Sequence, residues 1–201
     1  SVSLGCEEVK ATELIQGFAK RLNFKRPYIK TKIASSLDSK ISLSNGKSKW
    51  ITGINTRKLI HLFRLRSDGI LTGVNTVNED NPTLNCRING LKKYSPYVFI
   101  LDSKLSINIQ SKILNRKNIS IFTTVFLNKK KEKILKNKGI NLILVKHDKN
   151  NQVLLKDVIK KLYEQNINNL FLEAGSDINS SFLKDHLLDE IILCRSGCVF
   201  G

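Results

Sequence analysis

Apolar and polar positions follow two periods along this chain, one typical of strands and one typical of helices. Short apolar runs bounded by polar or glycine-containing segments predict strands at residues 28–34, 69–73, 97–102, 119–124, 140–146, 169–173 and 190–195. Helical spacing predicts helices at residues 7–22, 129–138 and 153–165, one after Asn55 or Thr56, and one from Ser176 to Leu187. Near-continuous apolar strands that alternate with helices favour an α/β fold, with a largely parallel central sheet flanked by helices.

Three segments need separate treatment. Residues 35–53 are rich in Ser, Gly and Asn, so we expect a loop there. Residues 74–82 are expected to turn, because Pro82 ends any helix that starts in this segment. The helix at residues 7–22 is expected to be amphipathic, and its apolar face consists of Ala11, Leu14, Ile15, Phe18 and Leu22.

The composition is that of an ordinary globular protein with an unusual charge. A length of 201 residues predicts one domain, or one domain and a short arm. The net charge of +17 invites a nucleic-acid-binding interpretation. However, most of the basic residues are Lys, Ile and Asn are abundant and Met is absent, which is the mixture that an AT-rich coding sequence produces. Only residues 129–138 concentrate Lys, and we expect them to form a solvated helix face, so no nucleic-acid partner is predicted.

The cysteine and hydropathy patterns indicate the cellular environment of the protein. Cys6, Cys86, Cys194 and Cys198 contain no Cys-x-x-Cys pair and lie far from the histidines, so the sequence predicts reduced thiols, no metal site and a cytoplasmic protein. No apolar run reaches the roughly 18 to 20 residues that span a bilayer, and no membrane association is predicted. The first residue is Ser, which indicates a start inside a longer product.

Candidate chemistry gathers at predicted strand ends, where open α/β sheets bind ligands. The candidate ends are residues 32–38, 72–80 and 173–176. Gly175, between a strand and a helix, lets backbone N–H groups approach a phosphate, although any tight turn can use a glycine. Arg64 and Arg87 could hold a phosphate between them, or serve as a helix-end charge and a surface residue. No Ser/His/Asp arrangement is present, so chemistry carried by a cofactor fits better than hydrolysis.

Two further residues keep alternative interpretations. Trp50 is either a core aromatic residue or a platform for a ring, and the pattern does not decide between them. Asp38 and Asp80 are more typical of caps or turns than of catalytic groups.

Several motifs follow one another in an order that resembles a known family: RPYIKTKIASSLDSKIS, GKSKWITG, LFRLRSDGILTGVNTVNEDNPTLNCR, VFILDS and LFLEAGSDINSSFLKDHLLDEIIL. Over roughly residues 5–201 the chain resembles the reductase domain of the bifunctional riboflavin-biosynthesis deaminase–reductase. The resemblance implies a dihydrofolate-reductase-like fold. It also implies NADPH-dependent reduction of 5-amino-6-(5-phosphoribosylamino)uracil, with hydride delivery to the ribosyl C1′.

The resemblance assigns roles to individual residues. Lys32 lies where the family has a Lys at the reaction centre, and Asp38 is expected to be structural or orienting. Cofactor contacts are implied for Ser35, Trp50, Thr76, Asp80, Ser103, Gly175, Ser176, Asp177, Ile178, Asn179, Ser180 and Ser181. Substrate contacts are implied for Ser48, Arg64, Leu84, Arg87 and Glu173, with the two Arg side chains near the substrate phosphate.

The same resemblance predicts the domain organisation and the partners. Residues 1–27 resemble the junction that follows a deaminase domain, and residues 28–201 form the reductase domain, which we expect to be cut short at its C-terminal end. The zinc motifs of a deaminase, His-x-Glu and Pro-Cys-x-x-Cys, do not occur, so we predict no deaminase activity and no zinc. A homodimer and a separate deaminase protein are the expected partners.

Two departures from the family and three other functions remain to be weighed. Ser39 stands where relatives carry Gly, and Ser35 where they carry Ala, so the Ser35 contact is expected to use its backbone. The alternatives are another pyridine-nucleotide reductase of this fold that acts on a pterin, a non-catalytic remnant, and a basic binding module. The preference for NADPH over NADH is implied by the resemblance alone.

Overall fold

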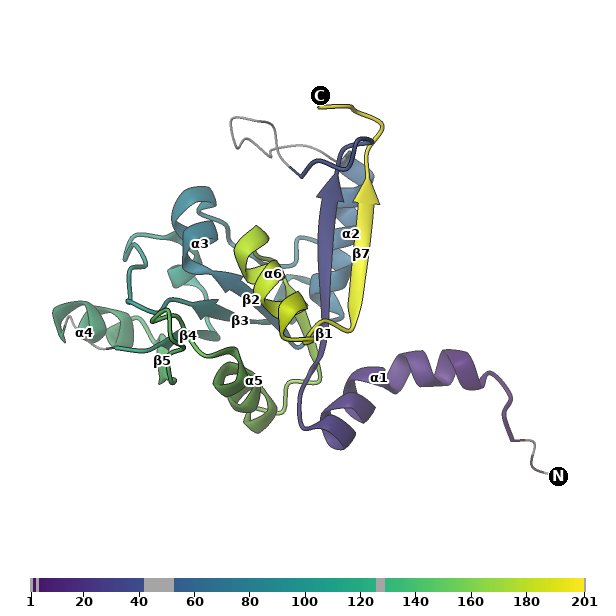
Figure 1. Cartoon of the computed structure of the whole chain (residues 1–201), viewed down its shortest axis with the longest axis horizontal. Helices are drawn as coiled ribbons and strands as arrows, with labels where there is room; N and C mark the ends of the chain where they lie inside the picture. The colour runs from purple at the N-terminus through teal and green to yellow at the C-terminus, as the bar shows by residue number, and fades with distance from the viewer. Residues whose placement is uncertain (1, 3, 42–52, 126–128, 201) are drawn as a thin grey trace.

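The strands of the computed structural model form one parallel sheet. The structure describes residues 2, 4–41, 53–125 and 129–200. The strands are β1 (Tyr28–Ser35), β2 (Gly69–Gly73), β3 (Tyr97–Leu101), β4 (Ile119–Thr123), β5 (Asn141–Leu144), β6 (Asn169–Leu172) and β7 (Glu190–Arg195). Their order is β5-β4-β3-β2-β6-β1-β7, and every neighbouring pair is parallel. The predicted α/β fold with a parallel sheet is confirmed (Figure 1).

Helices connect the strands and cover both faces of the sheet. The α-helices are α1 (Glu8–Phe24), α2 (Ile54–Leu65), α3 (Val74–Asp80), α4 (Lys129–Asn137), α5 (Leu155–Glu164) and α6 (Ser176–Lys184), and the short 3₁₀ helices are Lys92–Tyr94 and Lys112–Asn115. The prediction of a turn at residues 74–82 is wrong for its first seven residues, which form α3. Asn81 then takes a left-handed conformation with φ of 45°, and the helix ends before Pro82 as expected.

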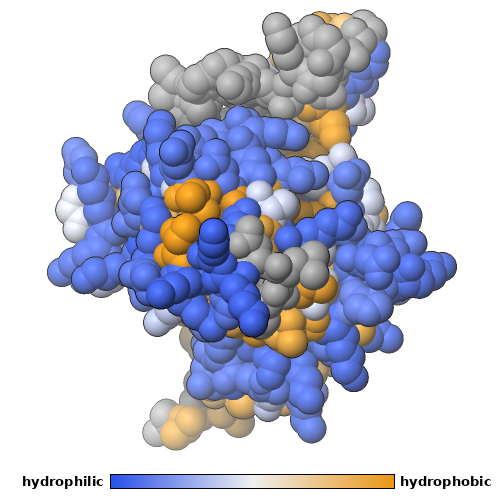
Figure 2. All heavy atoms as spheres, turned by 90° about the vertical axis from the view of Figure 1, so that its left-hand side faces the viewer, coloured by the Kyte–Doolittle hydropathy of each residue, from blue (hydrophilic) through white to orange (hydrophobic). Residues whose placement is uncertain are grey.

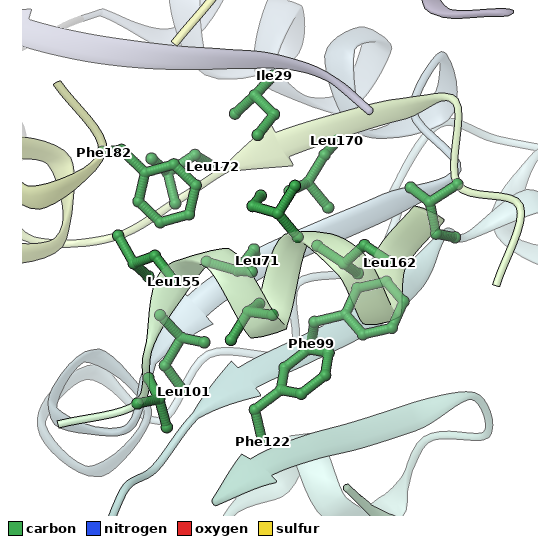
Figure 3. Close-up of a cluster of buried hydrophobic side chains, with 14 of the residues drawn as sticks. Ile29, Leu71, Phe99, Leu101, Phe122, Leu155, Leu162, Leu170, Leu172 and Phe182 are labelled. Carbon is green, nitrogen blue, oxygen red and sulfur yellow. The ribbon is translucent and has the colours of Figure 1, made fainter. Parts of the chain in front are cut away.

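Alternate residues of each strand pack on opposite faces of the sheet, which explains why the strands read as continuous apolar runs. One core cluster joins Ile29, Leu71, Phe99 and Leu172 to Leu162 of α5 and Phe182 of α6 (Figure 3). The second cluster lies on the other face and joins strand residues to α2, α3 and α4; its members include Ile70, Val77, Ile100, Ile121, Leu135 and Phe171.

Helix α1 forms as predicted, but most of its apolar face is not buried. Leu14 is 86% exposed and Phe18 is 51% exposed, and Figure 1 shows α1 extending away from the sheet. Only the second half of the helix is tied to the body: Gly17 packs against Asn169, and Arg21 Nε donates to Asn168 Oδ1 at 2.7 Å. The amphipathic pattern therefore predicts the helix correctly but not its partner.

The lysine-rich helix α4 presents most of its charge to solvent. Lys129, Lys130 and Lys133 are exposed, and Lys136 pairs with Glu132 at 2.6 Å. Figure 2 views the molecule from the side on which α4 lies in Figure 1 and shows a mainly hydrophilic surface with a smaller apolar patch. Over the described ranges, no helix combines the length and apolar character that crossing a membrane requires.

Candidate active site

One row of residues crosses the centre of the sheet at the carboxyl ends of its strands. Leu172 of β6 is in register with Thr31 of β1 and with Leu71 of β2. The next residues along the three chains are Lys32, Glu173 and Thr72, and the Glu173 amide donates to the Leu71 carbonyl at 2.9 Å. Because side chains alternate along strands, this row lies on the face that α2 covers. An ammonium, a carboxylate and a hydroxyl group thus lie next to one another.

Glu173 binds Arg64, which reaches it from the last turn of α2. Arg64 Nε and Nη2 donate to the two carboxylate oxygens of Glu173 at 2.7 and 2.8 Å. Both side chains are largely buried, with exposures of 12% and 18%. Burial alone would lower the pKa of the Arg64 guanidinium, but the hydrogen bond and the charge of Glu173 outweigh it, so its pKa is raised.

Asn85 brings the second arginine to the same place. Arg64 Nη1 donates to the Asn85 carbonyl at 3.0 Å, and Arg87 Nε donates to Asn85 Oδ1 at 3.3 Å. Arg87 is exposed and also donates from Nη2 to Thr83 Oγ1 at 3.1 Å. Since Glu173 offsets one positive charge, the cluster keeps an excess of positive charge that suits an anion such as a phosphate.

His61 lies one helical turn before Arg64 and faces the same cluster. Burial and then the charges of Arg64 and Arg87 lower the pKa of the imidazole. A hydrogen bond to the Asn85 backbone opposes this shift, and Nδ1 is buried with no hydrogen-bond partner among the residues that the structure describes. A neutral imidazole at neutral pH is the consequence.

Lys32, the predicted catalytic residue, is half-buried in the row beside Glu173. Burial lowers the pKa of its ammonium group, and the nearby Cys194 and Glu173 oppose the change. In the described part of the chain no carboxylate lies within ion-pair distance of its Nζ. The amine is therefore held close to a charged cluster without being neutralised by it.

The turn between β6 and α6 is fixed by side chains of α6 and β1. Asn179 Nδ2 donates to the Ala174 carbonyl at 2.7 Å, and Thr31 Oγ1 donates to Asn179 Oδ1 at 2.8 Å. Ile178 packs over Gly73 of β2, where an added Cβ would come within 2.4 Å of its Cδ1. Gly175 in the turn and four residues of α6 are exposed: Ser176, Asp177, Ser180 and Ser181.

The other predicted cofactor residues lie at the same edge but differ in accessibility. Ser35, at the end of β1, is 3% exposed, and its Oγ has no hydrogen-bond partner in the described part of the chain. Ser103 follows β3, and its Oγ donates to Gln152 and accepts from the Val153 amide, so the side chain is already satisfied. Thr76 and Asp80 lie on α3. Ser48 and Trp50 lie outside the described residues.

The sequence interpretation assigned no role to Asn85 or His61. His61 could have been found, because it stands three residues before Arg64 on a predicted helix. Asn85 acts through its backbone carbonyl and its loop conformation, for which the sequence carries no signal.

Comparison with known proteins shows to which family the chain is similar. The family model described as the RibD C-terminal domain matches residues 27–201. The riboflavin biosynthesis protein RibD of Aquifex aeolicus is 37% identical over the whole chain, which covers 54% of that protein. A 5-amino-6-(5-phosphoribosylamino)uracil reductase of Buchnera aphidicola from Acyrthosiphon pisum is 30% identical over 79% of the chain and 80% of the relative.

A solved structure extends the match to three dimensions. The diaminohydroxyphosphoribosylaminopyrimidine deaminase/5-amino-6-(5-phosphoribosylamino)uracil reductase of Thermotoga maritima superposes with a TM-score of 0.78 at 29% identity, covering 96% of this chain and 51% of that protein. The chain spans about half the length of the RibD relatives it matches. The expected resemblance and the expected fold are both confirmed.

Proposed function

Because the chain belongs to the RibD C-terminal domain family, we propose that it is a reductase of riboflavin biosynthesis that reduces 5-amino-6-(5-phosphoribosylamino)uracil with NADPH. The observation that carries the proposal is the meeting of Arg64 and Arg87 at Asn85. Arg64 is fixed by Glu173 and Arg87 is accessible, so the pair can receive the 5′-phosphate of a sugar without first being organised. A pterin lacks such a phosphate, which argues against a pterin reductase.

The turn before α6 and the end of β1 suit a dinucleotide. Gly175 is extended, with φ of −67° and ψ of 178°, and no atom lies within 4 Å of an added Cβ, so a pyrophosphate can approach the backbone. Ser35 ends β1, and its buried Oγ, which has no hydrogen-bond partner among the described residues, can bind a carboxamide. NADPH supplies the hydride when it is bound, and these residues hold and orient it.

The reaction needs one proton in addition to the hydride. Hydride addition at C1′ breaks the bond between C1′ and O4′, and O4′ takes up a proton to become the hydroxyl group of the ribityl product. We assign this proton to the Lys32 ammonium, because burial makes it a stronger acid than a free Lys. Glu173 keeps Arg64 in place while the substrate binds.

The test follows NADPH absorbance during turnover of the phosphoribosylaminouracil substrate by the wild type, Arg64→Ala and Arg87→Ala. We expect the KM for the substrate to rise about 10- to 100-fold in both variants, since charge-assisted hydrogen bonds contribute about 1.5 to 3 kcal/mol each. The KM for NADPH should change less than twofold. Arg87→Ala is the cleaner variant, because Arg64 also stabilises the buried Glu173.

Arg66→Ala is the matched control, because Arg66 is an exposed cation at the end of the same helix. Its kinetic constants should equal those of the wild type. Wild-type protein that fails to oxidise NADPH would refute the function, whereas unchanged substrate KM in Arg87→Ala would refute the phosphate assignment alone.

Two protein partners complete the proposal. The Thermotoga maritima relative, which has a deaminase in its name, is about twice as long as this chain, and α1 exposes Leu14 and Phe18 near the N-terminal end of the described chain. We place the deaminase, fused or separate, against this face. A second copy of the chain would pair along β7, an edge strand with Ile191 48% and Leu193 54% exposed.

A further inference from the structure

The backbone of Leu84 is strained at the centre of the arginine cluster. Leu84 has a φ of 45°, in the left-handed region that a residue with a bulky side chain rarely adopts, and its side chain is 4% exposed. Such a conformation persists only where the surroundings hold it, and strained residues concentrate at ligand sites. The next residue is Asn85, which contacts both Arg64 and Arg87. The conformation of Leu84 therefore decides where Asn85 presents its carbonyl and its side chain.

Arg116 is the side chain that holds this conformation. It follows the 3₁₀ helix Lys112–Asn115, and its Nη1 donates to the carbonyls of Thr83 and Leu84 at 2.9 and 2.6 Å. Its Nη2 donates to the Pro96 carbonyl at 2.8 Å. One planar guanidinium thus joins both sides of the connection between α3 and β3, and only an arginine has donors in this arrangement.

Arg116 is partly buried, and this burial costs free energy. No carboxylate lies within ion-pair distance of its guanidinium in the described ranges, and burial together with the charge of Arg64 lowers its pKa. A charge that is removed from water with only carbonyl groups as partners lowers the free energy of unfolding. This loss of stability is explained if the geometry of the segment that Arg116 holds is needed for function.

We propose that Arg116 is a positioning residue for the phosphate site: by fixing the left-handed turn at Leu84 it sets the position of Asn85 and, through Asn85, the distance between the Arg64 and Arg87 guanidinium groups. Arg116 does not touch the phosphate itself. This inference rests on the proposed function, because it takes the arginine pair to bind the substrate phosphate.

The experiment compares Arg116→Ala and Arg116→Lys with the wild type in the NADPH assay. We expect Arg116→Ala to raise the substrate KM at least fivefold, with kcat and the KM for NADPH unchanged within twofold. Arg116→Lys should restore part of the loss, because an ammonium can bind two of the three carbonyls. Lys117→Ala, which removes an exposed neighbouring cation, should behave as the wild type. A variant that only lowers folding stability would reduce kcat through loss of active protein and leave the KM values unchanged, and that result would overturn the inference.

A double variant tests whether Arg116 acts through the backbone of Leu84. Glycine adopts a φ of 45° without strain. Arg116→Ala should therefore raise the substrate KM by a smaller factor in a Leu84→Gly background than in the wild type. An equal rise of the substrate KM in both backgrounds would contradict the proposal that Arg116 acts through the turn at Leu84.

Binding of ribose 5-phosphate, measured by calorimetry, separates the inference from the proposed function. If the wild type does not oxidise NADPH, the function fails. The positioning role still stands if Arg116→Ala weakens ribose 5-phosphate binding as much as Arg87→Ala does, and it falls if Arg116→Ala binds as the wild type does.

Discussion

The carboxylate of Glu173 holds Arg64 through two charged hydrogen bonds in a largely buried position. Glu173→Gln keeps the shape of the side chain but removes its charge. We expect the free energy of unfolding to fall by about 1 to 3 kcal/mol, because the Arg64 guanidinium keeps its burial and loses its counter-charge. Urea unfolding monitored by circular dichroism measures the change.

Glu164→Gln is the control for this prediction. Glu164 pairs with Lys161 at 2.8 Å on the surface of α5, where both side chains are 42% exposed. An exposed pair of this kind contributes little to stability, because solvent screens it. Equal destabilisation by the two substitutions would show that burial of the Arg64 pair has no special consequence.

Single residues show which parts of the candidate site could be predicted from the sequence. Arg64, Arg87 and Glu173 were assigned by resemblance, and they lie close enough to share one site. Asn85 and Arg116 could not be assigned, because their contacts depend on the left-handed turn at Leu84. A side chain that binds carbonyls of a distant loop leaves no periodic or compositional trace.

Asp189 joins three elements at the other end of the sheet. Its carboxylate accepts from Arg26 at 2.6 and 2.8 Å and from the Ile29 amide at 2.9 Å, and it pairs with Lys20 of α1 at 2.9 Å. Burial alone would raise the pKa of the carboxyl group, but these hydrogen bonds outweigh it and hold the pKa below its usual range. The interaction therefore requires an ionised carboxylate.

The pH dependence of stability follows from this shift. A carboxylate with a lowered folded-state pKa contributes its stability above the unfolded-state value of about 4, and loses it as the pH falls through the folded-state pKa. We expect Asp189→Asn to be less stable than the wild type by about 2 to 4 kcal/mol at pH 7, and the difference to shrink below pH 4. Urea midpoints between pH 7 and pH 3 measure it, with exposed Asp185→Asn as the control. A difference that stays constant across this range would contradict the assignment.

Strands and most helices could be predicted because burial on both faces of a parallel sheet leaves long apolar runs. Residues 69–73 and 119–123 are buried at every position, and both were predicted as strands. Helix α3 was missed, because VNTVNED has no apolar periodicity and buries only Val77. The exposure of α1 could not be predicted either, since an amphipathic pattern does not say what covers the apolar face.

The exposed side chains of β7 lead to a prediction about the oligomeric state of the protein. If two copies pair along β7, Ile191→Lys should shift the protein toward a monomer in sedimentation velocity, because each copy would bury a charge next to another. Leu144→Lys on β5, the opposite edge strand, is the matched control, since Leu144 is 55% exposed. Identical sedimentation of the wild type and Ile191→Lys would remove β7 from the interface.

The position of β1 has a consequence for how the nascent protein folds. β1 is the first of these seven strands to be synthesised, yet it is inserted between β6 and β7, and the hydrogen-bonded residues Thr31 and Leu172 are 141 positions apart. Its neighbours do not exist until translation has passed Leu172, so β1 must wait while β2, β3, β4 and β5 can already assemble. Such high contact order slows folding, and during synthesis the unpaired strand is a natural target for chaperones.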